Sequence, residues 1–173
     1  MDIGKIRVEP LRHEHKRGAF LCSNQKIQNY CRNNAFRDNC AYKVRVYVAC
    51  EEDSIDVIGY YYLCLTSYKL GKLDDRADDK FGRVNAVPAV YLGMIGVHSE
   101  FARQGIGKLL MRDALLRVVS IAELAGTYAL ALDALDENLV AYYRDQFGFL
   151  SFKEGNGLEM FLPLMTIKAA LTD

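Results

Sequence analysis

The chain has 173 residues, of which 51% are hydrophobic, and it carries 22 basic and 22 acidic side chains. This length and apolar content predict one domain, residues 1–173, built around a single substantial core. A formal net charge of zero argues against a protein that binds nucleic acid through its total charge.

The charge is unevenly distributed along the sequence. Residues 1–45 contain ten Lys or Arg and four Asp or Glu, a net charge of +6, so the remainder carries −6. A basic N-terminal region of this kind predicts a face that meets phosphate, and an ordinary solvated surface is the alternative interpretation.

The same sequence argues against several other classes of protein. The five cysteines show no C-x-x-C spacing and no accompanying histidine pair, so no metal site is expected. The segment His13-Glu14-His15 is interpreted as a solvated loop. The N-terminus has no apolar signal region, and no apolar run reaches membrane-spanning length. We therefore expect a cytoplasmic protein without a metal and without a membrane partner.

The first half of the chain predicts three strands and one helix. Apolar residues at helical spacing predict the helix, with Ser23 as its N-cap. Tyr61 is expected to face the opposite side of its strand from Tyr60 and Tyr62. In chain order the elements are a strand at Ile6–Val8, the helix at Asn24–Asn39, and strands at Lys43–Cys50 and Ile55–Leu65.

The second half predicts strands that alternate with helices. A polar segment, residues 69–86, is expected to be a long surface loop with at most one helical turn. Gly126 is expected to end the longest helix as a C-cap. The elements are a strand at Val87–Val97, a helix at Gly105–Ala125, a strand at Tyr128–Ala134, a helix at Asp136–Gln146, a hairpin of Phe149–Phe152 with Leu158–Leu162, and a short helix at Met165–Leu171. This alternation predicts an α/β fold with a mixed sheet.

The most informative stretch is the turn between the strand that ends at Val97 and the helix that follows. Gly105 and Gly107 carry no Cβ, so the backbone can come close to a ligand there. The N–H groups of a helix's first turn have no partner within the helix and attract anions. The order of strand, glycine turn and helix therefore predicts a pyrophosphate site.

The segment Gln104-Gly-Ile-Gly-Lys-Leu-Leu110 resembles the coenzyme-binding turn of the GNAT superfamily of acyl-CoA-dependent N-acetyltransferases. That turn reads Q/R-x-x-G-x-G/A; Gly105, Ile106 and Gly107 match its last three positions, and Ala102 departs from the first. The resemblance implies the GNAT fold, with its fourth and fifth strands splayed around the coenzyme, and acetyl-CoA as cosubstrate. The residues that it implies for coenzyme binding are Ile95, Gly96, Val97, Arg103, Gln104, Gly105, Ile106, Gly107, Lys108 and Asn138.

A second likeness to the family lies downstream, where Tyr142-Tyr143 precedes Gly148-Phe149. In the family the tyrosine sits four residues before the glycine; Tyr143 sits five before it, so one extra residue must be absorbed, for example as a wide turn. The resemblance implies that Tyr143 is the catalytic general acid, which protonates the departing thiolate. The alternative is that both tyrosines are core aromatics.

A narrower resemblance covers nearly the whole chain. The segments Phe20–Asn24, Val57–Leu63 and Leu92–Val97 are similar to those of GNAT toxins from bacterial toxin–antitoxin pairs. The resemblance implies acetylation of the α-amine of aminoacyl-tRNA, which blocks translation, with the tRNA contacted by the basic N-terminal region. It also implies an antitoxin of ribbon-helix-helix type and leaves a homodimer open.

The sequence offers no obvious general base. Glu100, Asp133 and His98 are candidates, but the preferred interpretations are a turn surface, a helix-loop anchor and a strand-end cap, respectively. An α-amine, with a pKa near 8, needs a base less than a lysine amine near 10.4, so this absence favours an α-amine acceptor. Two alternatives stay open: an acetyltransferase for a small or protein amine, and a module that binds acyl-CoA without turnover.

Overall fold

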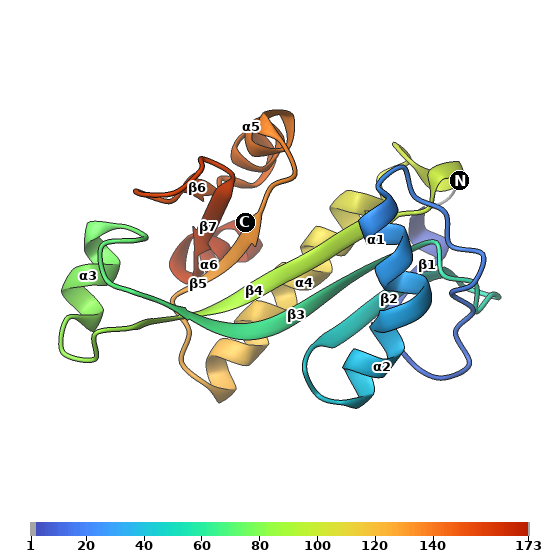
Figure 1. Ribbon diagram of the computed structural model, residues 1–173, viewed down its shortest axis with the longest axis horizontal. Helices are drawn as coiled ribbons and strands as arrows, with labels where there is room; N and C mark the ends of the chain where they lie inside the picture. The colour runs from blue at the N-terminus through green and yellow to red at the C-terminus, as the bar shows by residue number, and fades with distance from the viewer. Residues whose placement is uncertain (1–2, 173) are drawn as a thin grey trace. The chain divides into compact units, whose positions relative to one another are not determined.

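The computed structural model describes residues 3–172 and has a mixed α/β fold, which confirms the predicted class (Figure 1). Its strands are β1 (Ile6–Pro10), β2 (Arg45–Glu51), β3 (Gly59–Tyr68), β4 (Val87–Val97), β5 (Ala129–Asp133), β6 (Leu150–Ser151) and β7 (Glu159–Pro163). Its α-helices are α1 (Gln25–Asn29), α2 (Ala35–Cys40), α3 (Asp75–Phe81), α4 (Ile106–Leu124), α5 (Glu137–Phe147) and α6 (Leu164–Thr172). Shorter helical turns are η1 (Ile3–Lys5), η2 (Tyr30–Asn34) and η3 (Ser99–Phe101).

The strands follow the order β1-β2-β3-β4-β5-β7-β6, and the chain divides into two compact units. Unit 1 contains residues 1–64 and 92–114, and unit 2 contains residues 65–91 and 115–173. The strands β3 and β4 and the helix α4 each contribute residues to both units. Within the described residues no helix is long and apolar enough to cross a membrane, and no three His, Cys, Asp or Glu side chains gather as metal ligands.

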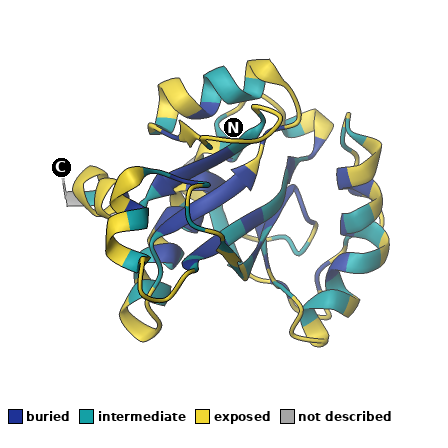
Figure 2. Cartoon of the chain, turned by 60° about the vertical axis from the view of Figure 1, so that its left-hand side comes forward, coloured by how far each residue is buried: buried dark blue, intermediate teal, exposed yellow. Residues whose placement is uncertain are grey.

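In unit 1 the strands β1, β2 and the start of β3 pair antiparallel, with Val46 opposite Tyr62 and Val48 opposite Tyr60. The prediction that Tyr61 faces away from its neighbours is confirmed. The Tyr60 hydroxyl donates to the carbonyl of Ile27 on α1 at 2.6 Å, whereas the Tyr61 hydroxyl donates to Asp113 on α4. Helices therefore cover both faces of these strands, and Figure 2 shows the strand residues buried.

The first helical segment is α1, η2 and α2 in succession, not the one regular helix that the sequence predicts. Ile27, Cys31 and Ala35 face the core at steps of four residues. A regular helix of 3.6 residues per turn would rotate such positions about 40° at each step. The wider π-helical turn η2 absorbs this drift and keeps the three side chains on the sheet. The N-cap is Asn24, whose side chain accepts from the amides of residues 26 and 27, so the prediction of Ser23 was wrong.

In unit 2 the strand β7 pairs antiparallel with β5 and β6, which confirms the predicted C-terminal hairpin. The core of this unit contains residues of α3, β4, β5 and β7, among them Ala77, Val87 and Phe161. The segment 69–86 was predicted to hold at most one turn, but it contains the seven-residue helix α3. Asp74 is the N-cap that starts this helix, and its carboxylate also accepts a hydrogen bond from Tyr128 at 2.8 Å. Gly126 has no positive φ, so it does not form the predicted left-handed C-cap.

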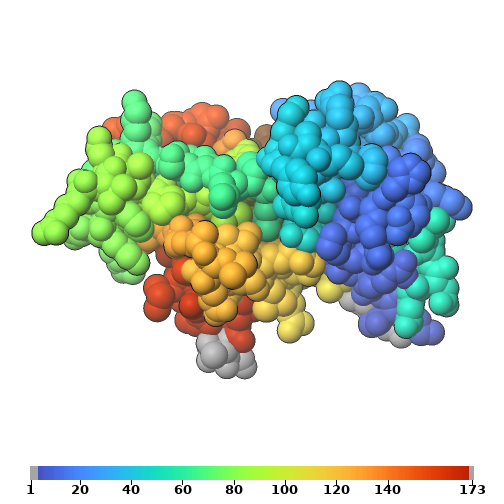
Figure 3. Space-filling view, turned by 90° about the horizontal axis from the view of Figure 1, so that it is seen from below, coloured from blue at the N-terminus to red at the C-terminus, as the bar shows by residue number. Residues whose placement is uncertain are grey.

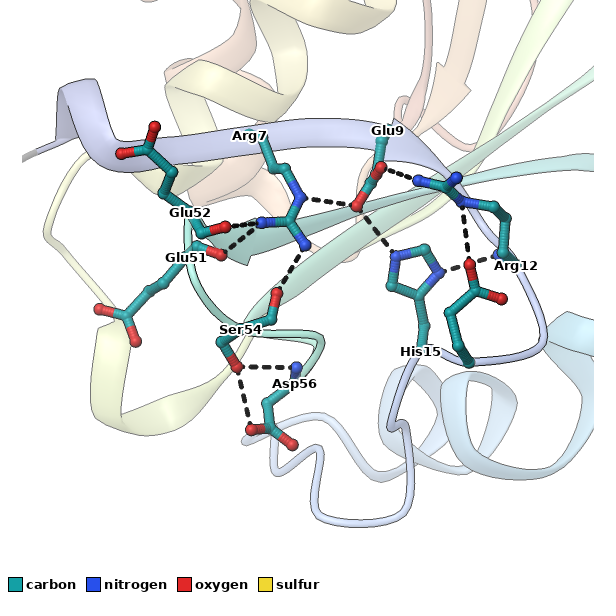
Figure 4. A network of polar contacts seen from close by, with 9 residues as sticks. Arg7, Glu9, Arg12, His15, Glu51, Glu52, Ser54 and Asp56 are labelled. Carbon is teal, nitrogen blue, oxygen red and sulfur yellow. Dashed lines mark hydrogen bonds and ion pairs between the residues drawn. The ribbon is translucent and has the colours of Figure 1, made fainter.

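A polar network holds β1 against the β2–β3 turn (Figure 4). Glu9 accepts from Arg7 Nε at 2.7 Å, from His15 Nε2 at 3.1 Å, and from Arg12. The guanidinium of Arg7 also donates to the carbonyls of Glu51 and Ser54 at 2.9 and 2.7 Å. His15 is 3% exposed, so its interpretation as a solvated loop residue was wrong.

This network predicts a pH-dependent contribution to stability. The hydrogen bond from Arg7, followed by those from His15 and Arg12, lowers the pKa of Glu9 from 4.5 to about 2, although burial opposes the shift. A lowered folded-state pKa stabilises the fold above pH 4.5, and this stabilisation is lost as the pH falls toward 2. In urea unfolding, Glu9→Gln should therefore have a clearly lower free energy of unfolding than wild type at pH 6. The difference between the two proteins should be smaller at pH 3.

The matched control is Glu14→Gln, because the Glu14 carboxylate is half-exposed and pairs with Arg12 at 3.4 Å. Its effect should be small at every pH, as for most exposed ion pairs. A stability gap for Glu9→Gln that stays constant between pH 6 and pH 3 would contradict this account.

Candidate functional site

The glycine turn has the backbone conformation that an anion site requires. Arg103 and Gly105 both have positive φ, 60° and 91°. The helix α4 begins directly afterwards at Ile106, and Leu109 makes the first hydrogen bond back to the turn, donating to the Gly105 carbonyl at 3.0 Å. Residues in the left-handed conformation next to the start of a helix direct successive N–H groups toward one point, which is the geometry of an anion-binding nest.

The amides of this turn are not used by the protein. Among the described residues, the N–H groups of residues 103–107 donate to no backbone or side-chain acceptor, whereas the flanking amides of Ala102 and Leu109 do donate. The Gln104 side chain donates to the Glu100 carbonyl at 3.0 Å, which closes the turn from outside. Five consecutive donors, at the positive end of a 19-residue helix, are thus free for an anion within the part of the chain that the structure describes.

Two glycines, one on β3 and one at the end of β4, each let a helix lie close to the strand backbone. A Cβ on Gly96 would lie 2.5 Å from Ile27 Cγ2 on α1, which shows direct packing of that helix on the strand backbone. A Cβ on Gly59 of β3 would lie 3.0 to 3.1 Å from Leu110 and Ile106 of α4. Ile106 itself is fully buried, so its side chain fixes the first residue of α4 on the strands.

His98 connects the strand end to the turn. Its backbone N–H donates to the Ile58 carbonyl at 2.8 Å, its Nδ1 accepts from the Glu100 N–H at 3.3 Å, and its Nε2 lies 3.2 Å from the Ala19 carbonyl. Because Nδ1 accepts, Nε2 must carry the proton that binds Ala19. The interpretation of His98 as a strand-end cap is therefore confirmed, and neither ring nitrogen is available as a base.

Tyr143 lies in unit 2, on α5, with its ring buried and its hydroxyl uncommitted. The residue is 7% exposed, and its ring packs against Tyr142, Phe147 and Phe149 at centroid distances of 5.6 to 6.5 Å. Its hydroxyl has no hydrogen-bond partner among the described residues and is accessible to solvent. Burial, and secondarily Tyr142, raises the pKa of Tyr143 to about 12.

The extra residue before Gly148 does not form a wide turn. The helix α5 runs without interruption from Glu137 to Phe147, and Gly148 follows it as a left-handed C-cap with φ of 78°. Asp136 caps the other end, where its side chain accepts from the Leu139 N–H at 2.9 Å. The predicted coenzyme ligand Asn138 lies in this first turn with an exposed side chain.

The predicted site residues fall into two groups. Ile95, Gly96 and Val97 at the strand end adjoin the glycine turn, and a Cβ on Gly107 would lie 3.9 Å from Val97 Cγ2. Residues 103–108 and this strand end belong to unit 1, and Asn138 and Tyr143 belong to unit 2. The sequence analysis missed the packing of Ile27 on Gly96. A glycine inside an apolar strand was the available signal, since it often marks a close approach of backbone.

The chain belongs to the acetyltransferase (GNAT) family, whose model matches residues 9–149. The matched segment contains the glycine turn, the strand before it and the helix that carries Tyr143. The family assignment therefore covers both groups of site residues.

Two curated relatives carry names that are more specific. A probable toxin TacT from Sinorhizobium fredii (strain NBRC 101917 / NGR234) is 33% identical over 95% of this chain and 94% of its own length. A tRNA-acetylating toxin from Mycobacterium tuberculosis (strain ATCC 25618 / H37Rv) is 26% identical over 72% of this chain and 73% of its own length.

Solved structures of the toxin AtaT share this fold. AtaT in complex with acetyl-methionyl-tRNAfMet has a TM-score of 0.85 and 22% identity, covering 96% of this chain and 99% of that one. A tyrosine-to-phenylalanine mutant of AtaT, bound to acetyl-CoA and the C-terminus of the antitoxin AtaR, has a TM-score of 0.82 and 22% identity, covering 97% and 99%.

The close packing at the strand end gives a test by substitution. Gly96→Ala should lower the free energy of unfolding by about 1–3 kcal/mol, because its methyl group overlaps Ile27. Gly126→Ala is the control, since a Cβ there meets nothing within 4 Å and the φ is not positive. Thermal and urea unfolding of both variants should show loss only for Gly96→Ala; equal stability of the two would contradict the observed approach of α1.

Proposed function

We propose that this protein transfers an acetyl group from acetyl-CoA to the α-amine of an aminoacyl-tRNA and thereby blocks translation. The observation that carries the proposal is the run of five uncommitted amides at residues 103–107, at the start of α4. In an acetyltransferase of this family such a run suits the pyrophosphate of coenzyme A. The relative named TacT, at 33% identity over nearly the whole length, supports a toxin, and the relative named tRNA-acetylating toxin supports the acceptor.

In the proposed reaction the amine nitrogen attacks the thioester carbonyl and releases a proton to water, the carbon–sulfur bond breaks, and the thiolate takes a proton. N–H groups of Ile95 to Val97 orient the pantetheine arm and polarise the carbonyl. Tyr143 donates a hydrogen bond, and then its proton, to the sulfur. With a pKa of about 12 the phenol stays protonated at physiological pH, and its hydroxyl has no competing partner among the described residues.

The remaining polar groups support an acceptor that needs no strong base. Both ring nitrogens of His98 are engaged in the turn. Asp133 accepts a hydrogen bond from Tyr91 at 2.9 Å, consistent with an anchor. An α-amine offers a useful unprotonated fraction at neutral pH, and a lysine amine offers almost none, so the site favours an aminoacyl group.

The proposed partners follow from this activity. The tRNA meets the basic residues of the N-terminal region; Lys5, Lys16 and Lys26 are exposed and have no ion-pair partner among the described residues. A ribbon-helix-helix antitoxin and a homodimer complete the assembly. The protein works as one catalytic domain in the cytoplasm, where charged tRNA and acetyl-CoA occur together.

The amide site predicts different effects for its two glycines. Gly105→Ala should weaken acetyl-CoA binding roughly 5- to 30-fold, because a φ of 91° costs an L-residue about 1–2 kcal/mol and the free turn relaxes. Gly107→Ala should leave binding within about threefold, since its φ is not positive and its Cβ has room. Calorimetric titration with acetyl-CoA measures both; unchanged affinity in Gly105→Ala would exclude this turn as the coenzyme site.

The activity is tested by mass spectrometry of RNA-bound amino acids after incubation of charged tRNA with labelled acetyl-CoA. Wild type should place label on the α-amine. Tyr143→Phe should keep acetyl-CoA affinity and lose about 10²- to 10⁴-fold in rate, the usual contribution of a general acid. The phenyl ring preserves the packing against Phe147 and Phe149, so the loss reports the hydroxyl alone.

Tyr142→Phe is the matched control, since it removes a neighbouring hydroxyl on the same helix, and its rate should stay within about threefold of wild type. Parallel reactions with a polyamine and a lysine peptide distinguish the alternatives. Label on those amines and none on charged tRNA would mean that the acceptor is a small or protein amine and not an aminoacyl-tRNA. Binding of acetyl-CoA without transfer to any amine would indicate a non-catalytic module.

A further inference from the structure

The acids of the helix α3 and its N-cap mostly have partners among the described residues whereas its cations do not, although the sequence of the segment is nearly neutral. Residues 69–86 hold five Lys or Arg and four Asp. Three of these acids are used within unit 2. Asp74 binds the Ala77 N–H and the Tyr128 hydroxyl, and Asp75 and Asp78 bind Lys153 in the turn of the C-terminal hairpin, at 2.6 and 3.3 Å.

The cations of this helix remain in solvent. Arg76, Lys80 and Arg83 are exposed, and none has an ion-pair or hydrogen-bond partner among the described residues; the Lys80 ammonium only approaches the Phe81 ring, at 5.7 Å. The helical rotation of about 100° per residue places the three within about 60° of one another. Arg83 continues this face because Gly82 keeps helical angles, φ −53° and ψ −31°. We call these three residues the α3 basic face.

This face is held rigidly by unit 2. Leu73 before the helix and Ala77 within it are buried in the core of unit 2, and Phe81 packs edge-on against Tyr128 at 5.8 Å. The Gly71 N–H donates to Asp78 at 2.7 Å, which fixes the segment before the helix. Figure 3 shows the segment around residue 80 at the open surface. Three of the four acids are engaged by partners in unit 2, whereas the three solvated cations form a positive strip about 10 Å long.

We propose that the α3 basic face binds the phosphate backbone of the acceptor tRNA. This inference rests on the proposed function, which supplies a tRNA as substrate. Phosphate contacts need rigidly placed Lys and Arg and no apolar anchor. A protein partner would need a cluster of aromatic or aliphatic anchors, whereas within residues 69–86 Val84 is the only large apolar side chain that is exposed.

The test compares tRNA affinity and activity in the full-length protein. Arg76→Gln, Lys80→Gln and Arg83→Gln together should weaken binding of uncharged tRNA roughly tenfold to a hundredfold at about 0.1 M salt. The slope of log affinity against log salt should become shallower by about 2 to 3. Asp79→Asn, which removes the remaining exposed acid beside this face, should tighten binding. Acetyl transfer to an aminoacyl-adenosine, which lacks the tRNA backbone, should be unchanged in all variants.

Arg112→Gln on α4 is the matched control, because Arg112 is also an exposed cation without a partner among the described residues. Equal losses for Arg112→Gln and for each single α3 substitution would mean that only net charge matters, and would overturn the proposal. Unchanged tRNA affinity in the triple variant would overturn it too. If that variant instead loses only its inhibition by a co-expressed antitoxin, the face binds protein and the proposal fails.

The failure of the proposed function gives a different result. A wild type that acetylates neither charged tRNA nor aminoacyl-adenosine lacks the proposed activity, whatever its tRNA affinity. A wild type that acetylates both, with a triple variant of equal affinity and salt slope, retains the activity and refutes the α3 basic face.

Discussion

The approach of two helices to bare strand backbone is the constraint on which the candidate site depends. Gly59 lets Ile106 and Leu110 of α4 lie against β3, and Gly96 lets Ile27 of α1 lie against the end of β4. Because α4 is fixed at its first residue, the orientation of the five N–H groups at residues 103–107 is fixed as well. An anion then meets donors that need no rearrangement, which is the condition under which backbone dipoles stabilise charge most effectively.

His98 extends this constraint from the strand to the turn. His98 donates its backbone N–H to Ile58, directly before β3, accepts from the Glu100 N–H in η3, and donates from its ring to Ala19. From its residue type and position in the sequence alone, a histidine at the end of such a strand is a candidate catalytic base. Its contacts here use both ring nitrogens, so His98 helps to position the turn before residues 103–107 and has no ring nitrogen free for proton transfer.

The sequence predicted much of the fold, because its strands are apolar runs bounded by turn residues. The prediction of Val87–Val97 as a strand, and of a helix after Gly105, was confirmed nearly to the residue. The π-helical turn at Tyr30 was missed, because apolar residues spaced four apart are also typical of a regular α-helix. Only the position of the sheet shows that the helix must widen. The burial of His15 was missed for a similar reason. Its partner Glu9 lies on β1, and a pair six residues apart without helical periodicity has no signature in the sequence.

Tyr143 shows where sequence and structure contribute different parts of one argument. The spacing to Gly148 suggested an irregular turn, but the helix is regular and the glycine ends it with a positive φ. The family resemblance predicts a role for this hydroxyl, and the structure adds that burial raises its pKa well above that of a free phenol. Reference values near 8.5 for a thiol and 10 for a phenol imply nearly matched proton transfer. With a pKa of about 12 the phenol is a weaker acid, so the proposed reaction requires a strong hydrogen bond to the developing thiolate before the proton transfers.

Total charge conceals how the cations of this chain are distributed. Unit 1 carries 13 Lys or Arg against 10 Asp or Glu, and unit 2 carries 9 against 12, so the neutral whole conceals two halves of opposite sign. Even this division is too coarse. Arg7, Arg12 and Arg37 of the basic N-terminal region are engaged by carboxylates, whereas acidic unit 2 presents the solvated cations of α3. A phosphate responds to cations without partners, and only the contacts show which those are.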